Sequence, residues 1–278
     1  MARSLVRTLT GVCLLSVAGA VMAEPEAGNP LEATAILDAG GFFMSTDIRV
    51  RLDGESSQSV GDPIDFDDTF GIADFDRFRV DGQWRIAGKH SLRGTYFKNN
   101  RSGSREMDRD IHFGDETFPF GVMTNAVSEV QLIQLSYDYA FRRRENYEFA
   151  AGIGVHMLDA KLGVSATIEG AGGSLSTELN ETASTNAPMP VLGIRGMWRL
   201  PHNFYATAQA QYFYVDFGDY AGSLSDLKAT LVWQATPHVG VGLGYNDFRF
   251  GFRLDKDQFS GRLRWSYGGA MAFVSVMY

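Results

Sequence analysis

Residues 268–278 read GGAMAFVSVMY and decide the fold. After the two glycines, apolar residues occupy every second position from Ala270 onward, and the last of them is the aromatic Tyr278. Strict alternation is the period of a β-strand, because successive side chains of a strand point to opposite faces of its sheet. The segment therefore predicts a strand with one continuous apolar face.

The same alternation recurs along most of the chain. Residues 78–86 (FRVDGQWRI), 133–141 (IQLSYDYAF) and 203–214 (NFYATAQAQYFY) each divide into an apolar face and a polar face. A soluble β-sandwich also alternates, with its apolar face turned inward. Alternation by itself therefore predicts an all-β protein and leaves its class open.

The lengths of the connections decide between these classes. Short turn signals stand at residues 88–90, 143–146, 201–203 and 236–238. Between consecutive signals lie two strand patterns joined by a longer polar, glycine-rich or acidic stretch. Alternating short and long connections are typical of transmembrane β-barrels. We therefore predict an all-β, transmembrane, antiparallel up-and-down β-barrel of about 10 strands, with eight or twelve if one of the long connections forms paired strands or one hairpin is misassigned.

The turn signals also set the expected strand limits. The predicted strands cover residues 41–53, 75–87, 90–101, 125–142, 147–164, 186–200, 203–217, 223–236, 238–253 and 258–278. The predicted long connections are residues 54–74, 102–124, 165–185, 218–222 and 254–257. With an even number of strands, both ends of the chain lie on the side of the short turns.

The beginning of the chain has the pattern of a secretory signal peptide. Arg3 and Arg7 precede an apolar stretch at residues 12–21, and small residues precede Glu24. We expect a signal peptide at residues 1–23 and a barrel domain at residues 24–278. The only cysteine, Cys13, lies inside the peptide, so no disulfide or cysteine metal site is expected in the mature chain.

Charge and hydropathy exclude two other classes. The formal net charge is −8, which argues against a nucleic-acid partner, because such binding depends on Lys and Arg that neutralise phosphates. After residue 23, no stretch approaches the 18 or so apolar residues of a membrane-spanning helix.

The C-terminal segment resembles the last strand of Gram-negative outer-membrane β-barrel proteins, which alternates apolar residues and ends on an aromatic one. Residues 187–196 and 239–250 are similar to segments of small, poorly characterised proteobacterial barrels. The resemblance implies a porin-like barrel in the cell outer membrane, in contact with outer-membrane lipid and lipopolysaccharide, and a monomer. It also implies an assembly signal that is read by the barrel-assembly machinery. The signal would consist of Ala270, Ala272, Val274, Val276 and Tyr278.

The alternation changes its parity within two of the predicted strands. In the last strand the apolar positions include Trp265 and Tyr267 and then change to Ala270. One extra residue in a strand exchanges its two faces, so the change predicts a β-bulge at residues 268–269. A similar change after Tyr245 predicts a second irregularity.

Tryptophan positions agree with a membrane interface. Trp84, Trp198 and Trp233 each lie three or four residues before a predicted short turn, and Trp265 lies toward the other end of the last strand. Amphipathic rings gather at the two membrane–water boundaries of a barrel. We therefore expect all four indoles on the outward face.

The polar face is expected to line the lumen. The candidate lumen residues are Asp47, Arg49, Arg51, Arg79, Asp81, Arg85, Arg195, Arg199, Arg262 and Arg264. Basic residues exceed acidic ones on this face. In one interpretation Asp47, Asp81, Asp138 and Glu148 pair with the arginines and fill a plugged or very narrow lumen, which the small size of the ring favours. In the other, the positive excess lines a narrow anion-preferring channel or a small-solute transporter.

No metal or cofactor site is expected. Asp65, Asp67 and Thr69 alternate as at the start of a calcium-binding loop, but Phe70 stands where that loop needs glycine. A cluster of solvated acids is the preferred interpretation of this stretch.

An enzyme is not expected either, although small outer-membrane hydrolases share this architecture. The one inward histidine pattern is His156, near Asp159 on its own strand and near Ser136 on the neighbouring strand. A single polar histidine inside a barrel is more often a hydrogen-bonded filler than a base. The sequence therefore favours a structural or surface-binding protein, with passive transport and an outer-membrane hydrolase as the alternatives.

Overall fold

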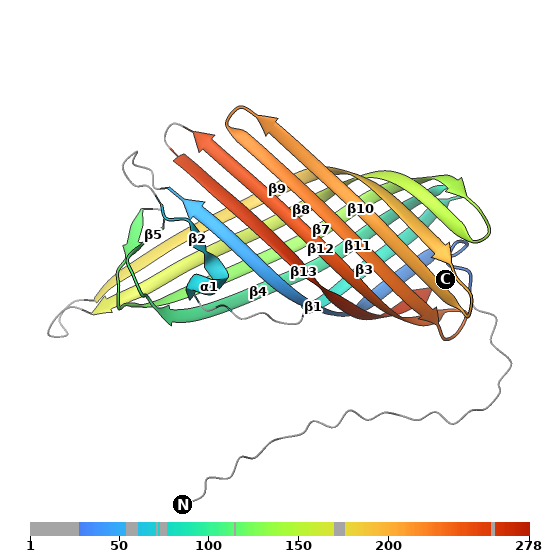
Figure 1. Ribbon diagram of the computed structural model, residues 1–278, viewed down its shortest axis with the longest axis horizontal. Coiled ribbons are helices and arrows are strands. Elements are labelled where there is room, and N and C mark those ends of the chain that lie inside the picture. Colours follow the sequence, from blue (N-terminus) through green and yellow to red (C-terminus); the bar gives the residue numbers. More distant parts are fainter. Residues whose placement is uncertain are drawn as a thin grey trace, which may run out of the picture.

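A computed structural model describes residues 28–53, 61–70, 72, 77–113, 115–169, 176–256 and 259–278. Ten antiparallel strands form a ring in which each strand pairs with the next along the chain, and β13 returns to pair with β1 (Figure 1). The predicted all-β barrel of about 10 strands is confirmed. The predicted signal peptide, residues 1–23, lies outside the described residues.

The ring consists of long strands. They are β1 (Ala35–Leu52), β3 (Arg77–Ala87), β4 (His90–Glu106), β7 (Met123–Arg143), β8 (Tyr147–Glu169), β9 (Ser176–Arg199), β10 (Phe204–Phe217), β11 (Tyr220–Gln234), β12 (Val239–Lys256) and β13 (Phe259–Met277). The long connections contain β2 (Ile64–Asp65), α1 (Phe66–Phe70), β5 (Ile111–Phe113) and β6 (Glu116–Phe118). The predicted loop at residues 165–185 is wrong, because β8 and β9 continue through most of it as paired strands. The predicted long connections at residues 218–222 and 254–257 are also wrong, because β10 and β11 pair as far as Phe217↔Tyr220, and β12 and β13 as far as Lys256↔Phe259.

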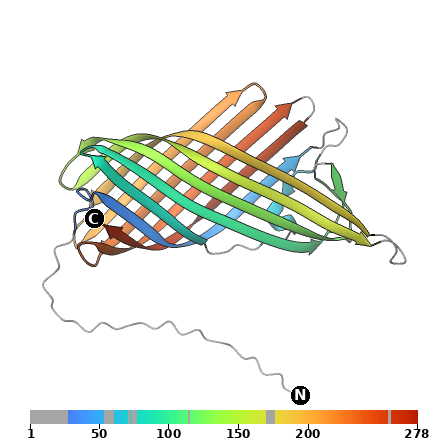
Figure 2. The same ribbon diagram turned by 180° about the vertical axis from the view of Figure 1, so that it is seen from behind.

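The two ends of the barrel differ. Two to four residues join the strands at the end that we call the short-turn end, where the C-terminus also lies (Figures 1 and 2). The first described segment, residues 28–34, lies at the same end, because Ala35 N–H donates to the carbonyl of Tyr278 at 2.9 Å. The opposite end, which we call the long-loop end, contains α1, β2, β5 and β6.

Toward the long-loop end the ring separates into two facing sheets. β9 and β10 pair only between Tyr205↔Arg199 and Tyr212↔Leu192, and beyond these residues the two strands diverge (Figures 1 and 2). On the other side, β3 pairs with β1 only as far as Phe42↔Arg77. Beyond that pair, β2 takes the place of β3 beside β1. The half of the barrel toward the long-loop end is therefore built like a β-sandwich, with two facing sheets around a core of its own.

The outward side chains change from apolar to polar part of the way along the strands. In β8 the outward residues are apolar up to Met157 and polar from Asp159 onward. The inward residues change in the opposite sense, since buried aliphatic residues begin at Leu158. On β8 the apolar outward band runs from Tyr147 to Met157, and a tilted strand needs about 9–11 residues to cross a bilayer. The charged exterior beyond it matches contact with water.

We call the last row of outward apolar residues the inversion level. On three adjacent strands it consists of Phe43, Ala270 and Tyr245, which stand opposite one another in the register of β1, β13 and β12. Beyond it the outward residues of these strands include Asp47 on β1 and Arg264 on β13. The change therefore occurs at one level across neighbouring strands.

This inversion corrects the predicted irregularities. The register of β13 against both neighbours is continuous through residues 268–269, and that of β12 is continuous beyond Tyr245. There is no bulge at either place. Trp265 and Tyr267 are buried in the interior, so the expected outward position of Trp265 is wrong, whereas Trp84 and Trp233 are exposed as expected. The pleat of β12 and β13 is therefore continuous at these places. What changes is the environment of each face, since the polar side chains now face outward and the apolar ones inward.

Helices do not provide a membrane-spanning segment in the described part of the chain. Among the residues described, no helix has both the length and the apolar character needed to cross a bilayer.

Arginine on the outward apolar band is expected to destabilise the barrel. Leu135 on β7 and Leu231 on β11 are about half exposed, and Ala208 on β10 shares the outward face. Replacing any of them by arginine near mid-membrane should lower the free energy of unfolding in lipid by about 2–4 kcal/mol. Denaturant titration in vesicles measures the change.

A matched control lies on the same strand and the same face as Leu135. Glu129 points outward beyond the inversion level. Glu129→Arg should therefore change the stability by less than about 1 kcal/mol, as for a surface position. Equal losses for Leu135→Arg and Glu129→Arg would show that the apolar band is misplaced.

Candidate functional site

The middle of the barrel interior contains a network of ion pairs. Arg79 contacts Asp81 with Nε to Oδ2 at 2.8 Å, and Lys228 Nζ lies 2.8 Å from Asp81 Oδ1. Thr95 donates its hydroxyl to the same carboxylate at 2.6 Å. Arg79 also donates to Asn246 Oδ1. These residues come from β3, β4, β11 and β12, so the network crosses the lumen.

A second group of ion pairs lies next to the first. Asp138 on β7 accepts from Arg93 Nε at 2.5 Å and from Arg195 Nε at 3.2 Å. Glu148 on β8 accepts from Arg195 at 2.7 Å and from Arg85 at 2.9 Å, and its side chain is fully buried. Arg195 therefore links two carboxylates. The predicted pairing of interior arginines with Asp81, Asp138 and Glu148 is confirmed.

Glycines on β8 make room for this network. A Cβ at Gly152 would stand 2.2 Å from Asp138 Oδ1, and one at Gly154 would stand 2.4 Å from Ser136 Oγ. Both distances are shorter than van der Waals contact. The polar side chains of β7 therefore lie directly across the backbone of β8, which requires residues without side chains at these two positions.

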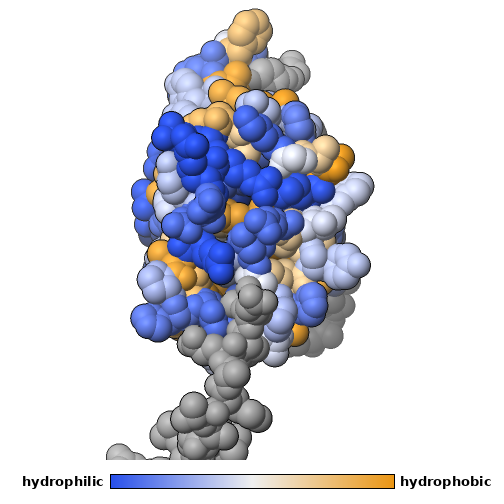
Figure 3. Space-filling view, turned by 90° about the vertical axis from the view of Figure 1, so that its right-hand side faces the viewer, coloured by the Kyte–Doolittle hydropathy of each residue, from blue (hydrophilic) through white to orange (hydrophobic). Residues whose placement is uncertain are grey.

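An apolar cluster closes the interior at the short-turn end. Leu31 of the first described segment is buried against residues that include Tyr205 and Met277. Arg143 donates to the carbonyl of Leu31, which holds the segment across the end of the barrel. In Figure 3, which looks onto this end, mainly hydrophilic side chains cover the middle. The segment thus covers the base of the ionic network.

Aromatic rings form the layer on the other side of the network. Tyr267 stacks on Phe248 with centroids 4.9 Å apart and also contacts Phe42, Phe97 and Trp265 at 5.2–5.7 Å. Beyond this layer the interior is apolar, and it includes α1.

The short helix α1 fills the barrel interior near the long-loop end. Phe66 and Phe70 of α1 are fully buried, and Asp67 forms an ion pair of 2.8 Å with Arg101 of β4. The expectation that the acids of this connection form a solvated cluster is therefore wrong for Asp67, whose side chain is mostly buried.

Ten residues were predicted to line the lumen, with basic residues in excess. The structure contradicts this position for five of them. Residues that point outward instead are Asp47, Arg49, Arg51, Arg262 and Arg264. The reason is the inversion: beyond Phe43 and Ala270 the buried positions of β1 and β13 are apolar, for example Ile48 and Trp265. Asp47 pairs with Arg49, as predicted, but on the outer surface.

The other five candidates lie on the inward face. Arg79, Arg85 and Arg195 are buried, and Asp81 is held between two cations. Arg199 shares the inward face at the short-turn end, where it is exposed beside the turn from β9 to β10. Without the outward arginines the expected positive excess is lost. The five cations of the central network are matched by five inward carboxylates, because Asp38 and the buried Asp226 add to Asp81, Asp138 and Glu148.

His156 is a buried hydrogen-bonded residue. Its Nε2 lies 3.1 Å from Gln211 Oε1, and Gln211 Nε2 donates to Ser136 Oγ at 2.9 Å. Gln211 therefore separates the histidine from the serine that could have formed a nucleophilic pair with it. Asp159, expected beside His156, points outward and is exposed. Within the described residues, no group of three or more histidine, cysteine or acidic side chains could hold a metal ion.

The five residues of the expected assembly signal lie on β13 and directly after it. Ala270, Ala272, Val274 and Val276 share the outward face of the apolar band, and the side chain of Tyr278 is largely exposed. Their role in assembly stays a prediction.

No protein-family model matches the chain, and no curated protein does. Solved structures do match. The outer membrane protease OmpT from Escherichia coli is 10% identical, with 88% of this chain and 96% of that one covered and a TM-score of 0.55. The P. putida toluene transporter TodX is 9% identical over 91% and 93% of the two chains, with a TM-score of 0.34. The outer membrane protein AlkL is 10% identical over 94% and 95%, with a TM-score of 0.36.

The likeness to OmpT defines the class of fold. The chain has the antiparallel barrel of Gram-negative outer-membrane proteins. At this identity, the likeness to OmpT concerns the fold alone.

Removing the carboxylate of Glu148 is expected to destabilise the barrel strongly. Glu148→Gln leaves Arg85 and Arg195 buried without that negative charge, and breaking a buried pair costs about 3–5 kcal/mol. Glu145→Gln, in the exposed turn between β7 and β8, is the matched control and should have little effect. Denaturant titration in vesicles measures both variants, and equal stabilities would contradict a structural role of the network.

The docking of α1 is expected to depend on pH. Burial raises the pKa of the Asp67 carboxyl to about 6, although Arg101 opposes the shift. Because the pKa is raised in the folded state, the stabilisation is complete below the ordinary value near 4 and is lost as the pH rises through about 6. Amide hydrogen exchange in α1, corrected for intrinsic rates, should therefore slow between pH 7 and pH 5.

Two asparagine variants test the assignment to Asp67. Asp67→Asn should remove the pH dependence, whereas Asp68→Asn, at an exposed neighbouring position, should keep it. A pH profile that is unchanged in Asp67→Asn would exclude this carboxyl as its source.

Proposed function

We propose that the chain is an integral protein of the Gram-negative outer membrane with a structural or surface role, and that its barrel is sealed by its own side chains. The observation that carries the proposal is the filling of the interior from end to end. An apolar cluster around Leu31, the ionic network around Asp138 and the aromatic layer around Tyr267 follow one another along the axis. Small barrels of this kind have interiors just wide enough for side chains to fill.

The exterior supports the membrane location. Apolar side chains face outward in a band between the short-turn end and the inversion level. Exposed aromatic residues stand at both edges, with Trp84 and Trp233 near the short turns and Phe43 and Tyr245 at the inversion level. Aromatic belts of this kind are typical of membrane-spanning barrels. The fold likeness to OmpT agrees with this location.

The interior gives less support to an anion-preferring channel. Four of the eight arginines that suggested one, Arg49, Arg51, Arg262 and Arg264, lie on the outer surface. A charge-balanced, hydrogen-bonded interior favours a closed barrel over a conducting one.

The histidines support a non-catalytic role. Four of the five are placed by hydrogen bonds to groups other than carboxylates: His90 to Tyr137, His112 to Thr117, His156 to Gln211 and His238 to the carbonyl of Met277. In the described residues, no histidine ring is hydrogen-bonded to a carboxylate, which is the partner that commonly orients a catalytic imidazole.

Conductance in a planar bilayer tests the proposal. The refolded protein should insert without producing discrete current steps, while a water-filled porin treated in the same way produces them. Insertion is verified by protection of the barrel from protease in the same vesicles. Reproducible steps from the inserted protein would overturn the sealed barrel, and anion selectivity of those steps would restore the channel interpretation.

A further inference from the structure

Arginines gather on the outer surface of β1, β12 and β13, beyond the inversion level. The register places Arg49 opposite Arg264 and Arg51 opposite Arg262 on adjacent strands. On the other side of β13, Arg253 stands opposite Arg262. Arg51, Arg262 and Arg253 therefore form one row across three strands. We call these five residues together with Arg249 the arginine patch.

Carboxylates neutralise only part of this patch. Arg49 pairs with Asp47 at 3.0 Å and Arg249 with Asp247 at 3.1 Å, yet the side chains of both arginines stay more than half exposed. Arg51 pairs with Asp53. Within the described residues, Arg262 and Arg264 form no ion pair, and both are exposed. The positive excess is thus centred on β13.

This arrangement is unfavourable for the protein alone. Residues directly opposite on antiparallel strands have Cβ atoms about 4.5–5.5 Å apart, and like charges at this distance repel. Here two such arginine pairs are adjacent, since Arg49–Arg264 and Arg51–Arg262 follow each other along the same two strands. An anion with several oxygen atoms would relieve the repulsion, because each guanidinium presents five donors in a planar fork that suits phosphate.

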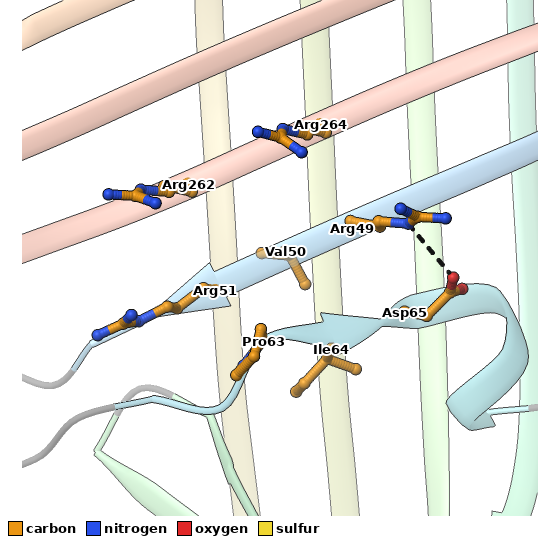
Figure 4. A pocket seen from close by; sticks show the side chains of 8 residues that line it. All are labelled: Arg49, Val50, Arg51, Pro63, Ile64, Asp65, Arg262 and Arg264. Carbon is orange, nitrogen blue, oxygen red and sulfur yellow. Dashed lines mark ion pairs between the residues drawn. The ribbon is translucent and has the colours of Figure 1, made fainter.

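The patch surrounds a groove that is wide enough for such a group. A cavity of about 600 Å³ is lined by Arg49, Arg51, Arg262 and Arg264, with Asp65 of β2 at its edge (Figure 4). In Figure 4 the four guanidinium groups extend from two neighbouring strands along one side of this region. Asp65 forms an ion pair with Arg49, with Nε and Oδ2 3.6 Å apart.

We propose that the arginine patch binds the phosphorylated sugar headgroup of lipopolysaccharide. The proposal rests on the outer-membrane location given above. A lipid whose acyl chains contact Phe43, Tyr245 and the rest of the apolar band would bring its phosphates to the surface just beyond them. The patch continues that band on the same strands, so one lipid can contact both.

The height of the patch favours a large glycolipid over an ordinary phospholipid. Arg49 follows Phe43 by six residues along β1, which corresponds to roughly 15 Å above the inversion level for a tilted strand. Arg249 follows Tyr245 by four residues, at roughly 10 Å. The headgroup region of a bilayer is only about 5–8 Å deep on each side. Phosphates carried on a stack of sugars reach the whole patch, whereas one glycerophospholipid phosphate reaches only its lower edge.

Binding of purified lipopolysaccharide to the refolded, detergent-solubilised barrel tests this site. The wild-type barrel should bind it, and the double variant Arg262→Gln/Arg264→Gln should bind about tenfold more weakly or worse, since two charge-assisted contacts are lost. Arg142→Gln/Arg144→Gln removes the same charge from the short-turn end and should bind like the wild type. Unchanged affinity in the Arg262/Arg264 variant would overturn the proposal.

Further arms identify the source of the phosphate. Dephosphorylated lipopolysaccharide should lose most of the affinity. Vesicles of phosphatidylglycerol, or inorganic phosphate at the same phosphate concentration, should compete poorly. Equal competition by the vesicles would show a general site for anionic lipid, and equal competition by free phosphate a simple anion site, and either result would overturn the assignment to lipopolysaccharide.

Folding and location are checked separately from binding. The variants alter exposed side chains, so their circular dichroism and their heat-dependent migration in gels should match the wild type. The current recordings described above do not depend on the patch. If the wild type and the Arg262/Arg264 variant bind lipopolysaccharide equally well and the barrel gives no current steps, only the proposed lipopolysaccharide site is overturned. If the barrel gives current steps and the variant binds more weakly, only the proposed sealed barrel is overturned.

Discussion

The structure depends on one constraint, the closure of ten strands into a ring. β1 and β13 pair along their whole length, from Ile36↔Met277 to Leu52↔Gly261. Because side chains alternate strictly along each of these strands, closure fixes for every residue whether it faces the interior or the exterior. Within the apolar band, closure also pairs the backbone groups of every strand with those of its neighbours, as a bilayer requires. The ionic network, the aromatic layer and the outer arginines are all consequences of this alternation.

The interior combines two kinds of packing that usually belong to different proteins. Where the exterior is apolar, the interior is polar, and charges such as Arg195 and Glu148 satisfy each other. Where the exterior is charged, the interior resembles the core of a soluble sandwich, with Phe66 and Phe248 fully buried. A buried ion pair contributes little net stability compared with apolar packing, but removing one partner is costly. The closed interior is therefore sensitive to single substitutions in the central network. The core near the long-loop end is stabilised by the burial of apolar surface instead.

Much of this fold could be predicted from local periodicity, and the errors have one cause. The ten strands and most of their limits follow from alternation and turn residues, and Arg79, Arg85 and Arg195 lie inside as expected. The rule that polar residues face the lumen fails for Arg262 and Arg264, because it holds only within the apolar band. The sequence does not mark the level at which a strand leaves that band. In the sequence, the exchange of polar and apolar faces at this level therefore has the same pattern as a β-bulge.

Other features could not be predicted because they depend on contacts between distant residues. The segment around Leu31 has no strand period, and its place across the end of the barrel is set by residues far along the chain, such as Arg143, Tyr205 and Met277. The same holds for α1, whose phenylalanines are buried in a core formed by β1 before it and by β4 and β7 after it in the chain. The extension of β8 and β9 was missed because small and polar residues dominate both strands there, which weakens the alternation.

The abrupt inversion level also determines how deep the barrel lies in a bilayer. Sinking by one pleat, roughly 5 Å along the axis, would carry charged residues such as Asp159, Asp247 and Arg249 toward the hydrocarbon region on several strands together. Rising by the same distance would expose apolar residues around the whole circumference to water. Each displacement is opposed by several strands at once, so the barrel has one preferred vertical position and little freedom to tilt. A membrane of a different thickness would have to stretch or thin around it.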